Sequence, residues 1–99
     1  MEPLRSKQRQ YLKGLAHGLS PVVRVGKSGL TEAVARETGH ALRAHELIKL
    51  RLEVEDGRER RAMADALAAE TGAAMVGTVG KVAILYRARE EDPAIRLPE

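Results

Sequence analysis

The hydrophobic residues change their spacing along the chain, and each spacing predicts a different kind of element. Between residues 6 and 19 apolar side chains recur every three or four positions, which is typical of an amphipathic helix. Ser6 is the expected N-cap, and Gly18 lies near the expected end of this helix. The stripe expected to face a core comprises Tyr11, Leu12, Leu15, Ala16 and Leu19.

The next segments predict two strands on either side of a second helix. Residues 21–25 are rich in valine and are bounded by proline and glycine, which favours a short strand. A helix is expected from about Leu30 or Thr31 to Ala44. Residues 46–54 alternate, which predicts a strand with one buried face and with Lys49 and Arg51 turned towards solvent.

The last third predicts one more helix and a hairpin. Asp56 is the expected N-cap of this third helix, and Gly72 closes it at the position where glycine is favoured. Residues 73–79 and 81–87 predict two strands that turn near Gly80. Residues 89–99 are acidic at first and then short of packing partners, so we expect a frayed tail.

These elements together predict a single domain of the α/β (α+β) class over residues 4–88. The predicted order is α-β-α-β-α-β-β, which allows a four-stranded mixed sheet covered by helices. A chain of 99 residues suffices for one domain but not for two.

Composition indicates the cellular environment in which we expect the domain. The chain contains no cysteine, so it has neither disulfides nor thiolate metal sites. No apolar run reaches the roughly 18–20 residues of a membrane span, and the N-terminus lacks the apolar stretch of a signal peptide. We therefore expect a cytoplasmic, monomeric protein that does not bind membranes.

Positive charge is concentrated in the first third of the chain. Residues 1–29 carry six cations and one anion, whereas the remainder carries eleven cations and thirteen anions. Such asymmetry favours a face that binds a polyanion, although ordinary solvated charge gives the same pattern. The cations that we expect to follow a phosphate backbone are Lys7, Arg9, Lys13 and Arg24.

The strongest local signal is a Gly26-Lys27-Ser28-Gly29 loop between a predicted strand and a predicted helix. Glycines let a ligand approach the backbone, a helix N-terminus offers unpaired N–H groups, and Lys27 adds a full charge. A nucleotide P-loop would require glycine where Pro21 stands, so that interpretation fails. A G-x-x-G clamp on a nucleic-acid backbone and a simple tight turn both remain open. A second copy of this pattern, at residues 77–80, lacks a cation and is interpreted as a turn.

No residue pattern indicates catalysis, a metal or a cofactor. His17, His40 and His45 do not have a metal-binding spacing, and packing or capping roles explain them better. Ser28 has no evident base nearby in the sequence, and a hydroxyl nucleophile needs one. We expect no enzymatic activity and no small-molecule substrate.

Several motifs together resemble one family. They are Ser6-Lys7-Gln8-Arg9 with Tyr11-Leu12, Ser20-Pro21-Val22-Val23, Val25 to Thr31 around the glycine loop, His45 to Lys49, Val79-Gly80-Lys81 and Leu85-Tyr86-Arg87. In this order they resemble the CRM domain (chloroplast RNA splicing and ribosome maturation), in particular its bacterial single-domain members of the YhbY type. The resemblance implies a fold similar to the C-terminal domain of initiation factor three. It also implies RNA binding with Gly26, Lys27, Ser28 and Gly29 as a KH-like loop.

The sequence therefore predicts an RNA-binding protein, with ribosomal RNA of large-subunit precursors as the partner that the resemblance implies. An adaptor whose basic face docks on an acidic protein is the alternative. An enzyme acting on nucleotides would need ATP binding, which the failed P-loop disfavours.

Overall fold

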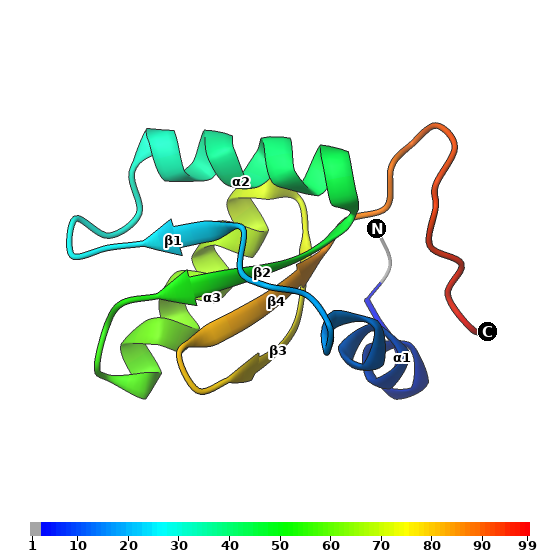
Figure 1. Cartoon of the computed structure of the whole chain (residues 1–99), viewed down its shortest axis with the longest axis horizontal. Coiled ribbons are helices and arrows are strands. Elements are labelled where there is room, and N and C mark those ends of the chain that lie inside the picture. Colours follow the sequence, from blue (N-terminus) through cyan, green and yellow to red (C-terminus); the bar gives the residue numbers. More distant parts are fainter. Residues whose placement is uncertain (1–2) are drawn as a thin grey trace.

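Three helices and four strands alternate along residues 3–99, the part of the chain that this computed structural model describes (Figure 1). They are α1 (Ser6–Ala16), β1 (Val23–Val25), α2 (Glu32–His45), β2 (Leu47–Leu52), α3 (Gly57–Thr71), β3 (Ala74–Val79) and β4 (Val82–Tyr86). The predicted order of elements and the α+β class are confirmed.

The strands form one mixed sheet in the order β1-β2-β4-β3. β1 runs parallel to β2, with Val23 opposite Leu50, whereas β4 runs antiparallel to both β2 and β3. The last strand of the chain therefore lies inside the sheet, and β1 and β3 are its edges. A bulge between Met75 and Gly77 shifts the register of β3 against β4.

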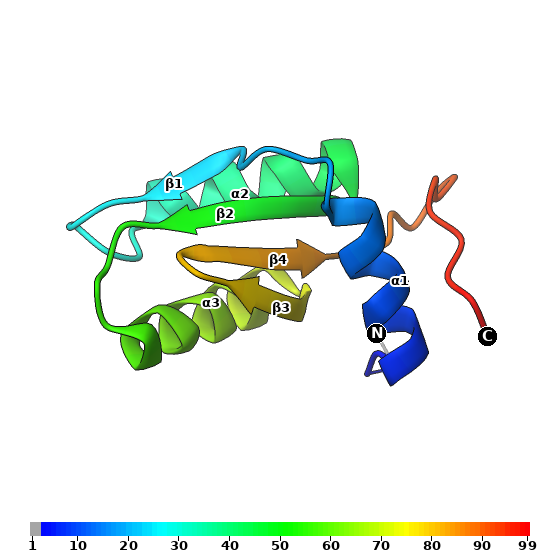
Figure 2. The same cartoon turned by 60° about the horizontal axis from the view of Figure 1, so that its bottom comes forward.

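Helices α2 and α3 cover one face of the sheet (Figures 1 and 2). Alternate strand residues point towards them because side chains of a strand alternate between its two faces. Leu42 of α2 and Leu67 of α3 are fully buried against these strand residues. The strand residues on this side are Val23, Val25, Ile48, Leu50, Leu52, Ala83 and Leu85.

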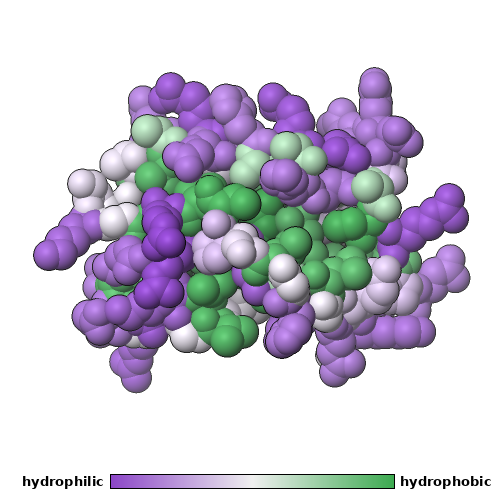
Figure 3. Space-filling model, in the orientation of Figure 1, coloured by the Kyte–Doolittle hydropathy of each residue, from purple (hydrophilic) through white to green (hydrophobic). Residues whose placement is uncertain are grey.

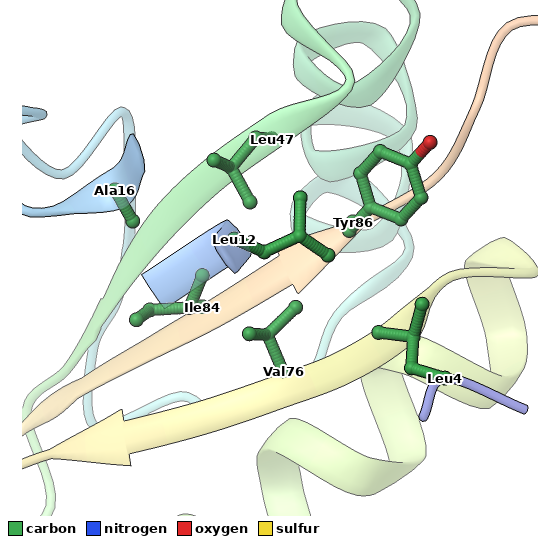
Figure 4. Close-up of a cluster of buried hydrophobic side chains, with 7 residues drawn as sticks. All are labelled: Leu4, Leu12, Ala16, Leu47, Val76, Ile84 and Tyr86. Atoms are coloured by element: carbon green, nitrogen blue, oxygen red, sulfur yellow. The ribbon is translucent and has the colours of Figure 1, made fainter. Parts of the chain in front are cut away.

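Helix α1 lies on the opposite face, at one end of the sheet (Figure 2). Figure 4 shows Leu12 in the middle of the resulting cluster, between side chains of β2, β3 and β4. Burying one leucine side chain stabilises a fold by roughly 1.5–3 kcal/mol. The cluster consists of Leu4, Leu12, Ala16, Leu47, Val76, Ile84 and Tyr86.

Helix α1 is shorter and less deeply buried than its apolar stripe predicts. It ends at Ala16 rather than near residue 19, and its N-cap is Arg5 rather than Ser6. The prediction that Tyr11 belongs to the core is wrong, because 42% of this residue is exposed. Leu15 and Leu19 are exposed to nearly the same degree, so the sheet covers only a narrow strip of the helix.

The signals at the ends of α3 act as predicted. The Asp56 carboxylate accepts hydrogen bonds from the backbone N–H groups of Arg58 at 2.8 Å and Glu59 at 3.1 Å. Gly72 ends the helix in the left-handed conformation with a φ of 72°. The expected turn at residues 77–80 is confirmed only at Gly80, where the β3–β4 hairpin turns with a φ of 57°, because residues 77–79 belong to β3.

The C-terminal segment packs on the domain, contrary to the expected fraying. Ile95 and Leu97 contact the cluster around Leu12. The carboxylate of Glu46, which is completely buried, accepts hydrogen bonds from the backbone N–H groups of Arg89, Ala94 and Ile95. This segment looked unsupported in the sequence because its anchor is more than forty residues away.

Candidate nucleic-acid interface

Part of the sheet face that carries α1 is left uncovered by any helix, and we call this part the open face (Figure 1). On β1 and β2 the side chains that point to it are Arg24, Lys49 and Arg51, since their neighbours in sequence are buried under α2 and α3. On β4 Val82 points to it, and Ile84, which is buried in the cluster around Leu12, lies at its border with α1. Figure 3 shows apolar surface along the middle of this view, with hydrophilic side chains around it.

The Gly26–Gly29 loop extends from the end of β1, at the far left of Figure 1. The N–H of Gly29 donates to the carbonyl oxygen of Gly26 at 3.0 Å and closes a turn. Gly29 has a φ of 73°, a conformation that glycine adopts without the steric cost other residues meet. Lys27 and Ser28 at the tip are exposed, and among residues 3–99 no carboxylate pairs with Lys27.

Helix α2 begins later than the sequence predicts, so it does not start directly after the glycine loop. Its first residue is Glu32, and its N-cap Thr31 accepts a hydrogen bond from the N–H of Val34 at 3.1 Å. This helix end is a weaker anion site than expected, because the Thr31 hydroxyl already accepts one of its free N–H groups and Glu32 adds a negative charge. The turn and Lys27 are thus the features of the loop that suit an anion best.

The three cations predicted on α1 point in different directions. Lys7 and Lys13 lie six residues apart, which places them about 120° apart around the helix. Arg9 is partly buried, and its guanidinium donates to the carbonyl oxygens of Met75 at 2.6 Å and Val76 at 3.4 Å. Arg9 therefore fastens α1 to β3, and of the three only Lys13 faces the open face.

A carboxylate partly neutralises the cations at the middle of the open face. Glu53 accepts a hydrogen bond from Arg51 at 2.8 Å and forms an ion pair with Arg24 at 3.3 Å. The hydrogen bond from Arg51 holds the pKa of Glu53 below its ordinary value, so Glu53 stays anionic. Arg24 nevertheless keeps 70% of its side chain exposed and can still reach a ligand.

A cleft of about 410 Å³ lies between α1 and the open face. Its lining combines basic and aliphatic side chains from α1, β2, β3 and β4, namely Lys13, His17, Lys49, Val79, Val82 and Ile84. The Lys49 ammonium donates to the carbonyl oxygen of Leu19 at 2.9 Å, which holds it at the mouth of the cleft.

The predicted site residues do not form one compact patch. The glycine loop and α1 lie at opposite ends of the molecule, and β1, the strand that carries Arg24, lies between them (Figures 1 and 2). Lys49 and Arg51, which the sequence placed on the solvent side of a strand, fill the gap. The sequence showed basic residues at every second position of a strand. It did not show which residues of other elements would lie beside them.

The chain is a single α+β domain with helices on both sides of a mixed sheet. An exposed glycine loop follows its first strand. The family described as the CRS1/YhbY (CRM) domain matches residues 4–87. The chain is a member of this family, and the resemblance inferred from its motifs is confirmed.

Relatives match over nearly their whole length. The RNA-binding protein of Haemophilus influenzae is 47% identical over 99% of this chain and 98% of its own. The Bacillus subtilis protein named "Probable RNA-binding protein YqeI" is 33% identical over 96% of this chain and 99% of its own. The solution structure of the Staphylococcus aureus protein SAV1595 has a TM-score of 0.86 at 30% identity and covers 96% of this chain and 99% of its own. These matches establish the fold and the family.

The helices in residues 3–99 are all too short or too polar to cross a membrane.

Proposed function

We propose that this protein binds RNA through the open face and the Gly26–Gly29 loop, and that its RNA is ribosomal RNA of large-subunit precursors. It acts as a cytoplasmic monomer, without catalysis and without a cofactor. The relatives named as RNA-binding proteins support RNA as the class of partner.

The observation that carries the proposal is the row of cations that connects the loop with α1. Lys27 stands at the exposed loop tip, Arg24 and Arg51 follow on neighbouring strands, and Lys49 and Lys13 reach the cleft. Contacts of this kind hold a phosphate backbone without reading its sequence. Loop amides and Lys27 bind one phosphate, and the other cations extend the track.

Salt dependence tests the proposal directly. If five cations each neutralise a phosphate of a single strand, log K falls with log salt at a slope of about −3.5. A filter-binding titration between low and high salt measures this slope, and a flat response would refute the proposal.

Charge reversal at the loop locates the site. We expect Lys27→Glu to weaken RNA binding about tenfold or more, because it reverses the charge at the loop tip. The melting temperature should not change, because residue 27 is exposed. Arg36→Glu, an equal change at an exposed position of α2, is the control and retains binding. Unchanged affinity of folded Lys27→Glu would place the site elsewhere.

Sedimentation on a gradient distinguishes an RNA partner from an acidic protein partner. The protein is expected to migrate with large-subunit precursors and to be released by RNase. Persistence after RNase treatment would favour the adaptor function instead.

A further inference from the structure

We infer that the cleft between α1 and the open face holds one unpaired base of a single-stranded RNA segment, with the adjoining phosphate on Lys13 and Lys49. This inference rests on the proposed function and adds that the RNA is unpaired where it crosses the sheet. It concerns the surface lined by Lys13, His17, Lys49, Val79, Val82 and Ile84.

The lining has the two halves that a nucleotide requires. Val79, Val82 and Ile84 form an aliphatic floor, and Val79 remains 69% exposed at the end of the hairpin. Basic side chains come from α1 and β2 on the other side, and the lining contains no carboxylate in the part of the chain that the structure describes. An apolar surface favours the flat face of a base, and ammonium groups favour the phosphate.

Gly77 gives Lys13 its position. A Cβ atom at residue 77 would lie 2.6 Å from Cε and 3.2 Å from Nζ of Lys13. The lysine can therefore lie flat across β3 only because this position lacks a side chain. Its ammonium lies beside the aliphatic floor while the residue as a whole remains exposed.

Lys49 adds a second positioned cation. Its ammonium uses one of three N–H donors on the carbonyl oxygen of Leu19, which leaves two for a ligand. The cavity of about 410 Å³ lies within the size range of small-ligand sites.

The position of the cleft also fits a strand of RNA that reaches the glycine loop. Lys49 lies next to Val22 in the register of β1 and β2, because Arg24 is opposite Arg51. Val22 and Lys27 are five steps apart along the chain, and at 3.3 Å per step these span at most about 17 Å. Bases inside a duplex are stacked and paired, so only an unpaired base can enter a cleft on this path.

The test compares two oligomers that carry the same charges. One is a fluorescently labelled 12-nucleotide oligouridine, and the other is an abasic ribose-phosphate oligomer of equal length. Fluorescence anisotropy measures the affinity of the full-length protein for each. We expect the wild-type protein to prefer oligouridine about fivefold, which is what burial of roughly 40 Å² of apolar surface between a base and the aliphatic floor contributes.

Val79→Glu replaces part of the aliphatic floor by a carboxylate and is expected to reduce this preference to less than about twofold. Ala62→Glu makes the same change of net charge at an exposed position of α3, on the other side of the sheet, and retains the preference. Lys13→Met, at an exposed position, removes a phosphate contact that both oligomers make, so it is expected to weaken the binding of both and to leave the preference unchanged. Circular dichroism verifies that each variant is folded.

The outcomes separate this inference from the proposed function. A wild-type protein that binds neither oligomer at low salt refutes RNA binding itself. A wild-type protein that binds both equally, or a Val79→Glu variant that keeps the preference, overturns the base site and leaves backbone binding intact.

Discussion

Replacing Glu46 by glutamine is expected to loosen the C-terminal segment and to destabilise the whole domain. Oε1 accepts the N–H groups of Ala94 at 2.8 Å and Ile95 at 3.0 Å, and Oε2 accepts that of Arg89 at 2.8 Å. Burial by itself raises the pKa of Glu46, but these three donors and the charge of Arg89 outweigh it and hold the pKa below its ordinary value.

The magnitude follows from the three hydrogen bonds. Glutamine keeps one oxygen acceptor, but its NH₂ group then faces either the N–H of Arg89 or those of Ala94 and Ile95, and it cannot accept from them. At least one bond to a charged acceptor is lost, which costs about 2 kcal/mol of the free energy of unfolding. For a domain of this size the melting temperature falls by about 10 °C. Urea unfolding and calorimetry measure both quantities.

The pH dependence gives the stricter test. Because the folded-state pKa is lowered, the stabilisation by Glu46 is complete above the ordinary pKa of a glutamate, about 4.3, and is lost as pH falls through the folded value. The difference between wild type and Glu46→Gln should therefore shrink as the pH falls below the ordinary pKa of a glutamate and through the lower folded-state value. Glu55→Gln is the control, because Glu55 is exposed and its ion pair with Lys81 lies at the surface. Equal stability at pH 7, or a difference that does not shrink as the pH falls, would refute this account.

Three further changes probe other parts of the molecule. Gly29→Ala forces a side chain into a positive-φ position and should cost about 1–2 kcal/mol of stability and weaken RNA binding; an unaffected loop would contradict the role of the turn. Asp56→Ala removes the α3 cap and should cost about 1 kcal/mol in urea unfolding, with RNA affinity unchanged. Arg9→Met removes the bonds to the carbonyls of β3 and should cost about 1–3 kcal/mol while RNA affinity changes less than about twofold; the reverse result would make Arg9 an RNA contact.

The sequence predicted the elements well, because each depends on neighbours within a few residues. Period-two alternation located β2, and Asp56 and Gly72 located both ends of α3. The width of the buried strip on α1 could not be predicted in the same way. A stripe that includes Tyr11 shows which side of a helix is apolar, but how much of that side is covered depends on where the helix rests on the sheet.

The candidate site was predicted in its parts and not in its arrangement. Lys27 and its glycines were identified from four adjacent residues. Lys49 and Arg51 acquire meaning only beside Lys13 and Arg24, and this proximity comes from strand pairing and from the position of α1. Glu46 could not be connected to residues 89–95 because no periodic pattern links them.

The position of β4 has a consequence for how the chain folds as it is synthesised. β4 pairs with both β2 and β3, yet it is the last strand to be made. Until residues 82–86 emerge, the β1–β2 pair and β3 have no strand to join them, and the nascent chain exposes two unpaired edges. The sheet therefore closes late and at its centre, and a chain truncated before Val82 should remain unfolded.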